Sequence, residues 1–308
     1  MWVLLVLAGL AVAVIIVWPF WIDRRRPAIG PTERHGTEGG FAQLSQGVTH
    51  YRWIGPARGP VAVVVPGFAT AMDALETVAE GLGGMGYRVL LYDLYGRGLS
   101  DAPRGLQDRA FFLRQLSDVL AYFGLNDEIT LVGYSMGGSI AVAHAAERPF
   151  LVKRVILIAP TGIVRNETRF SAFCRRVPWL GDWVHALFAH RRIAATIPER
   201  GQTPAIDKAM RAYRRDLGRR GFLPGLLSSR RGIMAEVQQD AHVQLGRKGI
   251  PVVAIWARAD PIIPLTAIGK LAEWNRTARH EVIEGAAYGL PFTHGREVVA
   301  ALREALRD

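Results

Sequence analysis

Residues 129–147 constrain the fold of this 308-residue chain more than any other stretch. An apolar run over 129–132 stops at a glycine-rich turn, Gly133 to Gly138, and an alanine-rich helical pattern follows directly to about residue 147. A strand that turns sharply into a helix needs glycines where the two elements pass close together. This order predicts that Ser135 lies at the carboxyl end of a parallel strand, with its hydroxyl exposed above the positive end of a helix.

Apolar runs and helical patterns alternate through most of the remaining chain. Strands rich in Val, Ile and Leu that are joined through helices predict an α/β fold with a mostly parallel central sheet covered on both faces. In such sheets, sites lie at the carboxyl ends of the strands. Strands are expected at 61–65, 88–92, 129–132, 155–158, 252–256 and 281–283, and helices at 71–85, 106–123, 136–147, 265–274 and 296–306.

The amino-terminal segment predicts a membrane anchor. Residues 2–22 carry no charge and precede Asp23 and three arginines, Arg24 to Arg26. At helical rise they span ~31 Å, enough to cross a bilayer. No basic residue precedes this run and no clear small-x-small site follows it, which argues against a cleaved signal peptide. We therefore interpret residues 1–23 as one transmembrane helix, and the flanking arginines place the following domain in the cytoplasm.

The segment after the predicted anchor differs from the rest of the chain. Residues 27–40 are polar and rich in glycine and proline, so we expect a flexible linker over 24–46. The sheet does not need the ninety or so residues before its penultimate strand. We therefore expect a core formed by 47–161 and 250–308, with a helical insertion at 162–249.

Two loops beyond the predicted strands carry candidate site residues. A glycine before Phe68 frees the backbone, so the N–H groups of Phe68 and Met136 are expected to point at one spot beside the Ser135 hydroxyl. Two such donors would stabilise an oxyanion by about 3 kcal/mol each. Asp260 follows the strand at 252–256 in a proline-stiffened loop. From there its carboxylate can reach across the end of the sheet and orient an imidazole.

From about residue 48 to its end, the chain resembles the α/β-hydrolase superfamily, in the capped branch that includes serine esterases and lipases. The resemblance rests on the turn around Ser135, the Phe68 loop, the Asp260 loop and the order of strands and helices. It implies the α/β-hydrolase fold, the order Ser, acid, His, a helical cap at 162–249, and no metal or organic cofactor. Serine at 135 argues against the dehalogenase and epoxide hydrolase members, which carry aspartate there.

The third catalytic partner departs from this pattern. Tyr288 stands where the resemblance predicts histidine, and a phenol with a pKa near 10 is a poor base for serine at neutral pH. Besides His280, which should lie at the start of the last strand, only His294 follows Asp260. Three explanations fit: His294 acts as the base through a folded-back loop, the chain has lost or altered hydrolase chemistry, or Tyr288 replaces a native histidine.

The predicted insertion is both aromatic and basic. Its apolar side chains suggest a hydrophobic acyl or aryl pocket, although most must also pack the insertion itself. Residues 162–249 hold 17 Lys/Arg and 7 Asp/Glu, a net charge of +10 out of the chain's +11. Nucleic acid, an anionic substrate and anionic lipid could each pair with this charge. No nucleic-acid motif accompanies the arginines, and with a membrane anchor attraction to anionic lipid is the simplest interpretation, beside that of a solvated helical surface. The apolar residues are Phe170, Phe173, Trp179, Leu180, Trp183, Leu187, Phe188, Phe222 and Leu223.

Together these patterns predict a membrane-anchored serine hydrolase that cleaves a carboxylic ester of a lipophilic or aromatic substrate. Thioester, amide and carbon–carbon bond hydrolysis use the same groups and remain alternatives, as does a non-catalytic binder of hydrophobic small molecules. No metal site is predicted, because Cys174 is the only cysteine and the histidines of the insertion lack ligand spacing. The expected partners are a small hydrophobic ester and membrane lipid, without nucleic acid.

Overall fold

The computed structural model describes residues 1–194 and 203–307, which form an α/β fold around a single sheet. The strand order is β1-β2-β4-β3-β5-β6-β7-β8. Neighbours from β4 to β8 are parallel, and β1 and β2 join that sheet in antiparallel fashion. The strands are β1 (Gly40–Leu44), β2 (Gly47–Ile54), β3 (Val61–Val65), β4 (Arg88–Tyr92), β5 (Ile129–Tyr134), β6 (Val152–Ile158), β7 (Val252–Ala257) and β8 (Arg279–Ile283).

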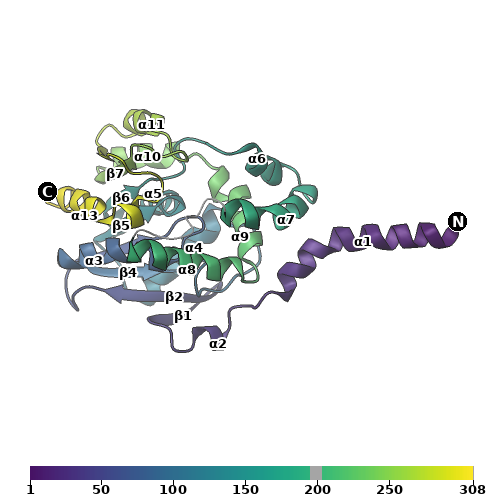
Figure 1. The fold of residues 1–308 in the computed structure, drawn as a ribbon. Coiled ribbons are helices and arrows are strands. Elements are labelled where there is room, and N and C mark those ends of the chain that lie inside the picture. Colours follow the sequence, from purple (N-terminus) through teal and green to yellow (C-terminus); the bar gives the residue numbers. More distant parts are fainter. Residues whose placement is uncertain (195–202, 308) are drawn as a thin grey trace.

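Helices cover both faces of the sheet, as predicted (Figure 1). One face carries four helices that pack together, and the other carries two. Because both faces are covered, the central strand β5 is buried at every position, which explains its continuous apolar run. The first group is α4 (Arg109–Tyr122), α5 (Met136–Glu147), α10 (Gln239–Arg247) and α11 (Thr266–Trp274); the second is α3 (Glu76–Gly84) and α13 (Gly295–Ala305), which the short α12 (Leu290–Thr293) precedes.

Four helices between β6 and β7 form the insertion: α6 (Arg169–Arg176), α7 (Leu180–Ala194), α8 (Pro204–Leu217) and α9 (Phe222–Arg231). A small core of their own holds them, formed by Tyr213, Leu217, Phe222, Leu223 and Leu226 with Ala189. The expected insertion at 162–249 extends too far at its end. Helix α10 lies within that range but packs against α5 and α11, so it belongs with the core.

The linker expected at 24–46 differs from the structure. Helix α1 continues to Arg25, a short helix α2 spans Pro31–Arg34, and β1 begins at Gly40. Arg34 pairs with Asp101 at 2.6 Å, and the Arg220 N–H donates to the Pro27 carbonyl at 3.0 Å. The segment is polar because it lies on the surface, and side-chain contacts fix it there.

Helix α1 (Trp2–Arg25) extends away from the folded domain (Figure 1). Its length and apolar composition suffice to cross a membrane, a test that a signal sequence would also pass. Two contacts tie it to the insertion. The Trp183 indole N–H donates to the Ile15 carbonyl at 2.9 Å, and the Asp23 carboxylate accepts from the Gly221 N–H at 3.3 Å.

Candidate active site

Ser135 occupies the sharp turn between β5 and α5. Its φ of 53° and ψ of −117° are strained for a residue with a side chain, and such strain is typical of functional sites. After the turn, α5 passes close to the end of β3. This approach requires a glycine at 137, because a Cβ there would lie 2.1 Å from the Val65 carbonyl oxygen. The sequence predicted an exposed hydroxyl. Instead Ser135 is fully buried, because another side chain covers it.

That side chain is Tyr288, which hydrogen-bonds to the Ser135 hydroxyl through its own hydroxyl. The Tyr288 ring lies beside Tyr134 with 5.6 Å between ring centroids, and the Tyr134 hydroxyl donates to the Tyr288 carbonyl at 3.0 Å. Burial, together with the nearby Asp260 charge, raises the pKa of Tyr288 above that of an ordinary phenol. At neutral pH the phenol therefore keeps its proton and cannot accept one from serine.

Asp260 lies in the loop after β7 and uses only half of its carboxylate. Its Oδ1 accepts hydrogen bonds from the N–H groups of Ile262 at 2.7 Å and Ile263 at 2.9 Å. Its Oδ2 is buried and has no partner among the described residues. Burial raises the pKa of Asp260, and the two backbone hydrogen bonds oppose that rise. The side chain thus has one buried acceptor oxygen free.

The structure does not bring His294 to the nucleophile. His294 lies between α12 and α13, where it is the N-cap residue of α13 and its Nδ1 is 3.0 Å from the Thr293 hydroxyl. Within the described chain it forms no hydrogen bond with Ser135 or Asp260. The short helix α12 carries the chain away after Tyr288, so the folded-back loop that this histidine would need is not formed.

The loop after β3 lies against the nucleophile. A Cβ on Gly67 would lie 3.2 Å from the Ser135 Cβ, a tight contact that glycine avoids. Met136 is the first residue of α5, which leaves its N–H without a partner inside the helix. The structure records no hydrogen bond from the Phe68 N–H to a described residue. Neither amide is used by a described residue, so the expected role of both as oxyanion donors stays a prediction.

Arg97 is a residue of this site that the sequence analysis missed. It is buried after β4, and its guanidinium donates to the Phe68 carbonyl at 2.9 Å and to the Ser229 hydroxyl at 2.7 Å. Burial lowers the pKa of Arg97 to about 9. Arg97 thereby links the Phe68 loop to helix α9 of the insertion. In the sequence Arg97 is one of many arginines and lies between two glycines, so nothing there indicated that it contacts the Phe68 loop.

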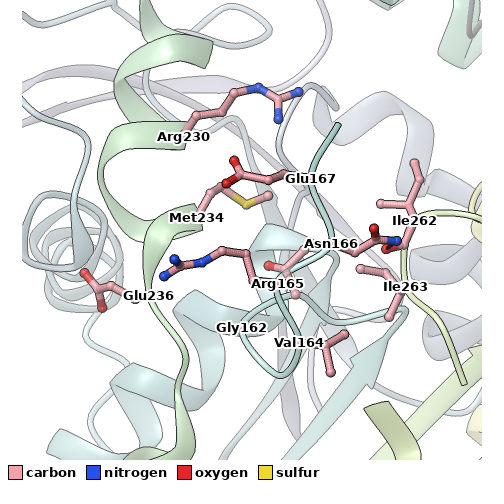
Figure 2. Close-up of a pocket in the computed structure, with 11 residues that line it drawn as sticks. Gly162, Val164, Arg165, Asn166, Glu167, Arg230, Met234, Glu236, Ile262 and Ile263 are labelled. Atoms are coloured by element: carbon pink, nitrogen blue, oxygen red, sulfur yellow. Dashed lines mark hydrogen bonds between the residues drawn. The ribbon is translucent and has the colours of Figure 1, made fainter. Parts of the chain in front are cut away.

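A cavity of about 50 Å³ opens between the insertion and the end of the sheet (Figure 2). It borders the site, because the Thr161 N–H in its wall donates to the Ser135 carbonyl at 3.1 Å and the Ile263 N–H donates to Asp260. Its lining is more polar than the sequence suggested. It includes Arg165, Asn166, Glu167, Arg230 and Glu236.

The aromatic residues expected to line a hydrophobic pocket lie elsewhere. Phe173, Trp179, Leu180 and Phe188 are exposed, and Trp179 is 85% exposed. Phe222 and Leu223 pack the small core of the insertion. Composition alone does not tell which face of a helix its apolar residues occupy, so it could not distinguish a pocket lining from an outer surface.

The remaining histidines take no part in this arrangement. His185 and His242 are buried in the insertion and in α10, and His190 is exposed. His280 lies on β8, where its Nδ1 accepts from the Trp256 indole at 3.2 Å. His280 thus lies on the last strand, as expected from the sequence.

Comparison with known proteins places the chain in a family. The family model described as "Serine aminopeptidase, S33" (Hydrolase_4) matches residues 56–287, and the chain belongs to this family of α/β-hydrolases. The match stops one residue before Tyr288. Among curated relatives, a haloalkane dehalogenase of Mycolicibacterium paratuberculosis is 30% identical over 70% of this chain and 72% of its own. The chain is thus a hydrolase by descent.

The chain is also similar to an esterase in sequence and to a phospholipase in structure. The pimeloyl-[acyl-carrier protein] methyl ester esterase of Chromobacterium violaceum is 30% identical over 81% of this chain and 95% of its own. A solved bacterial membrane phospholipase A superposes with a TM-score of 0.69 at 18% identity, and covers 99% of this chain and 98% of its own. At that identity the similarity shows a shared fold.

Proposed function

We propose that this chain has the machinery of a serine hydrolase for carboxylic esters, with proton transfer limited by Tyr288. The observation that carries the proposal is the Ser135 hydroxyl, held in a strained turn and hydrogen-bonded by the one side chain at the position of the base. Beside it lies an acid, Asp260, with a buried acceptor oxygen that no described residue uses. The esterase of Chromobacterium violaceum supports an ester as substrate.

In the proposed reaction, the Ser135 Oγ attacks the ester carbonyl carbon, and the amides of Phe68 and Met136 hold the oxyanion. Collapse expels the alcohol, which takes up the serine proton, and water then releases the acid from the acyl-enzyme. A base must move the proton in both steps. Tyr288 cannot do so at neutral pH, since its phenol remains protonated.

A serine at 135 also supports ester chemistry over dehalogenation. The dehalogenase relative shares 30% identity, but displacement of a halide from carbon in such enzymes begins with an aspartate at the turn, as the superfamily resemblance implies. Ser135 stands there instead. The second candidate is a non-catalytic binder, which the Ser135–Tyr288 hydrogen bond favours because it occupies the nucleophile.

Ser135→Ala is expected to reduce hydrolysis of p-nitrophenyl butyrate to the buffer blank. The parent chain should be slow but measurable, because Ser135 can still attack beside the two oxyanion donors although no positioned base removes its proton. Ser139→Ala is the matched control: Ser139 is equally buried, on the same helix, and bonds Thr161 at 2.9 Å. The rates are measured from the absorbance of the p-nitrophenol that is released. Equal rates for the parent and Ser135→Ala would remove Ser135 from the mechanism.

We also propose that α1 anchors the chain in a membrane with the hydrolase domain on the cytoplasmic side. Three arginines at its C-terminal flank support this orientation. The exposed Trp179 directly precedes α7, which begins at the exposed Leu180 and whose Trp183 contacts Ile15 of α1. Large apolar side chains beside an apolar helix are typical of a membrane-contacting surface, and the +10 charge of residues 162–249 would favour anionic lipid.

Removal of residues 1–26 is expected to release a folded domain from membranes. The full chain should remain in the pellet through a wash in 1 M salt, whereas the shortened chain should appear in the supernatant with the same far-ultraviolet circular dichroism. The domain should survive because its main core contains no residue of α1. Retention of the shortened chain after the salt wash would contradict anchoring by α1.

A further inference from the structure

Arg230 is a half-buried cation that reaches the site from the end of α9. Its Cζ lies 4.6 Å from the centroid of the Phe68 ring, and its Nη1 donates to the Ser171 hydroxyl at 2.5 Å. Burial lowers the pKa of Arg230, and Tyr288 is among the groups that oppose this change. The guanidinium therefore lies within electrostatic reach of the pair formed by Ser135 and Tyr288.

No acidic side chain neutralises this guanidinium within the described residues. Glu167 lies on the same cavity wall but is engaged by Arg175, at 3.0 and 2.5 Å. The neighbouring Arg231 offers a contrast, because it forms two hydrogen bonds with Asp182 at 2.9 and 2.8 Å. A half-buried charge without a counter-ion costs stability, and such a perturbed group in a cavity wall is a candidate for ligand binding.

The cavity places Arg230 near residues that contact Ser135 and Asp260. Arg230 lines it together with Thr161 and Ile263, whose N–H groups donate to the Ser135 carbonyl and to Asp260. Figure 2 shows Arg230 and Glu167 on one rim of the cavity and Ile262 and Ile263 on another side. A ligand in this space would touch the cation and two residues, Thr161 and Ile263, that are hydrogen-bonded to Ser135 and Asp260.

We propose that Arg230 binds an anionic group on the ester substrate, so that the substrate carries a carboxylate or phosphate in its acyl or alcohol part. This rests on the proposed role of Ser135 as the nucleophile and replaces a purely apolar ester as the substrate class. A guanidinium suits the purpose, because its planar fork donates two parallel hydrogen bonds to carboxylate or phosphate oxygens.

The first test measures binding and needs no turnover. Calorimetry on the full chain compares monomethyl adipate, methyl hexanoate and the methyl ester of 5-phosphonopentanoic acid. The chain should bind an anionic ester about tenfold more tightly than the neutral one, as expected for a hydrogen-bonded charge. Tighter binding of adipate identifies a carboxylate, and tighter binding of the phosphonate identifies a phosphate. Equal binding of all three would overturn the proposal.

Substitutions of Arg230 test whether this residue causes the preference for an anionic ester. Arg230→Gln should abolish the preference, and Arg230→Lys should keep part of it because the charge stays while the fork is lost. Arg169→Gln is the matched control, since it removes the same charge from an exposed position on α6. A preference that Arg230→Gln retains, or that Arg169→Gln loses equally, would overturn the assignment.

The second test uses turnover in a Tyr288→His background. The ratio of kcat/KM for mono-p-nitrophenyl adipate over p-nitrophenyl hexanoate should fall about tenfold with Arg230→Gln and stay the same with Arg169→Gln. A ratio unchanged by Arg230→Gln would contradict the inference. Should this background hydrolyse neither ester, the proposed hydrolase function fails, and the binding measurement still decides the role of Arg230.

Discussion

Tyr288→His is expected to raise Ser135-dependent hydrolysis of p-nitrophenyl butyrate about 10²- to 10⁴-fold, the range of a positioned general base. An imidazole at 288 would stand where the phenol now bonds the Ser135 hydroxyl. Its other ring nitrogen would have a partner ready, because the Asp260 Oδ2 is buried and unused by described residues. Ser135, histidine and Asp260 would then form the complete acid–base relay.

Two controls separate the gain of a base from the loss of a phenol. Tyr288→Phe uncovers the Ser135 hydroxyl without adding a base, so it should stay near the parent rate. Tyr288→His combined with Asp260→Asn should lose most of the gain. The asparagine amide has one acceptor oxygen instead of two, and it carries no charge to stabilise the protonated imidazole. Rates at pH 7.5 under substrate saturation, followed by absorbance, give the comparison.

The outcome decides between the two functions proposed. A large gain identifies position 288 as the site of the base and the chain as a disabled or slowed hydrolase. A Tyr288→His variant no faster than the parent would favour the non-catalytic binder. Loss of parental activity in His294→Ala would instead identify His294 as the base, which requires a conformation that differs from the described α12–α13 junction.

Sequence alone predicted the parts of this fold where the chain is buried on all sides. Strands β3 and β4 and helix α5 begin and end at the expected residues, because continuous Val/Ile/Leu runs and a glycine turn leave few alternatives. The β1–β2 hairpin was missed. Most of its residues are only partly buried and the run lacks a continuous apolar stretch, with glycines at the start of both strands, so the segment resembled a linker.

Only part of the site could be predicted from the sequence. The superfamily resemblance predicted a histidine where Tyr288 stands, and in the structure the Tyr288 hydroxyl is hydrogen-bonded to that of Ser135. The full burial of Ser135 did not follow from the sequence, since it depends on the length of the phenol that covers it. Arg230 also could not be found, because only the fold shows which basic residues of the insertion line a cavity.

Acidification from pH 7 to pH 5 is expected to destabilise the folded domain through three buried histidines. His144, His185 and His242 are each at most 3% exposed. Burial lowers the pKa of each to about 4, with nearby arginines adding to the effect at His144 and His185. The unfolded chain, with histidine pKa values near 6.5, therefore binds protons that the folded chain does not.

The difference in bound protons sets the sign and size of the change in the free energy of unfolding with pH. Stability is full above about pH 6.5 and falls as the pH drops toward 4, where the folded histidines begin to protonate. Between pH 7 and pH 5 each histidine should lower the free energy of unfolding by about 2 kcal/mol. Three such groups remove a large share of the 5–15 kcal/mol typical of a folded domain, so we expect a marked loss of stability at pH 5.

His50 acts in the opposite direction and partly offsets the loss. It is buried against Asp93, with its Nδ1 2.8 Å from the Asp93 Oδ2. Burial alone would lower the pKa of His50, but the hydrogen bond and charge of Asp93 raise it above the usual value. Its contribution is therefore complete below pH 6.5 and is lost as the pH rises through the folded pKa.

Urea unfolding of the domain at pH 7 and pH 5, followed by circular dichroism, measures the effect. His144→Gln and His242→Gln should each reduce the difference between the two pH values by about 2 kcal/mol, whatever they cost at pH 7, because glutamine does not titrate. His35→Gln, at an exposed position, is the matched control and should leave the difference unchanged. Equal pH dependence in the parent and in both buried variants would show that these histidines are already protonated in the folded domain.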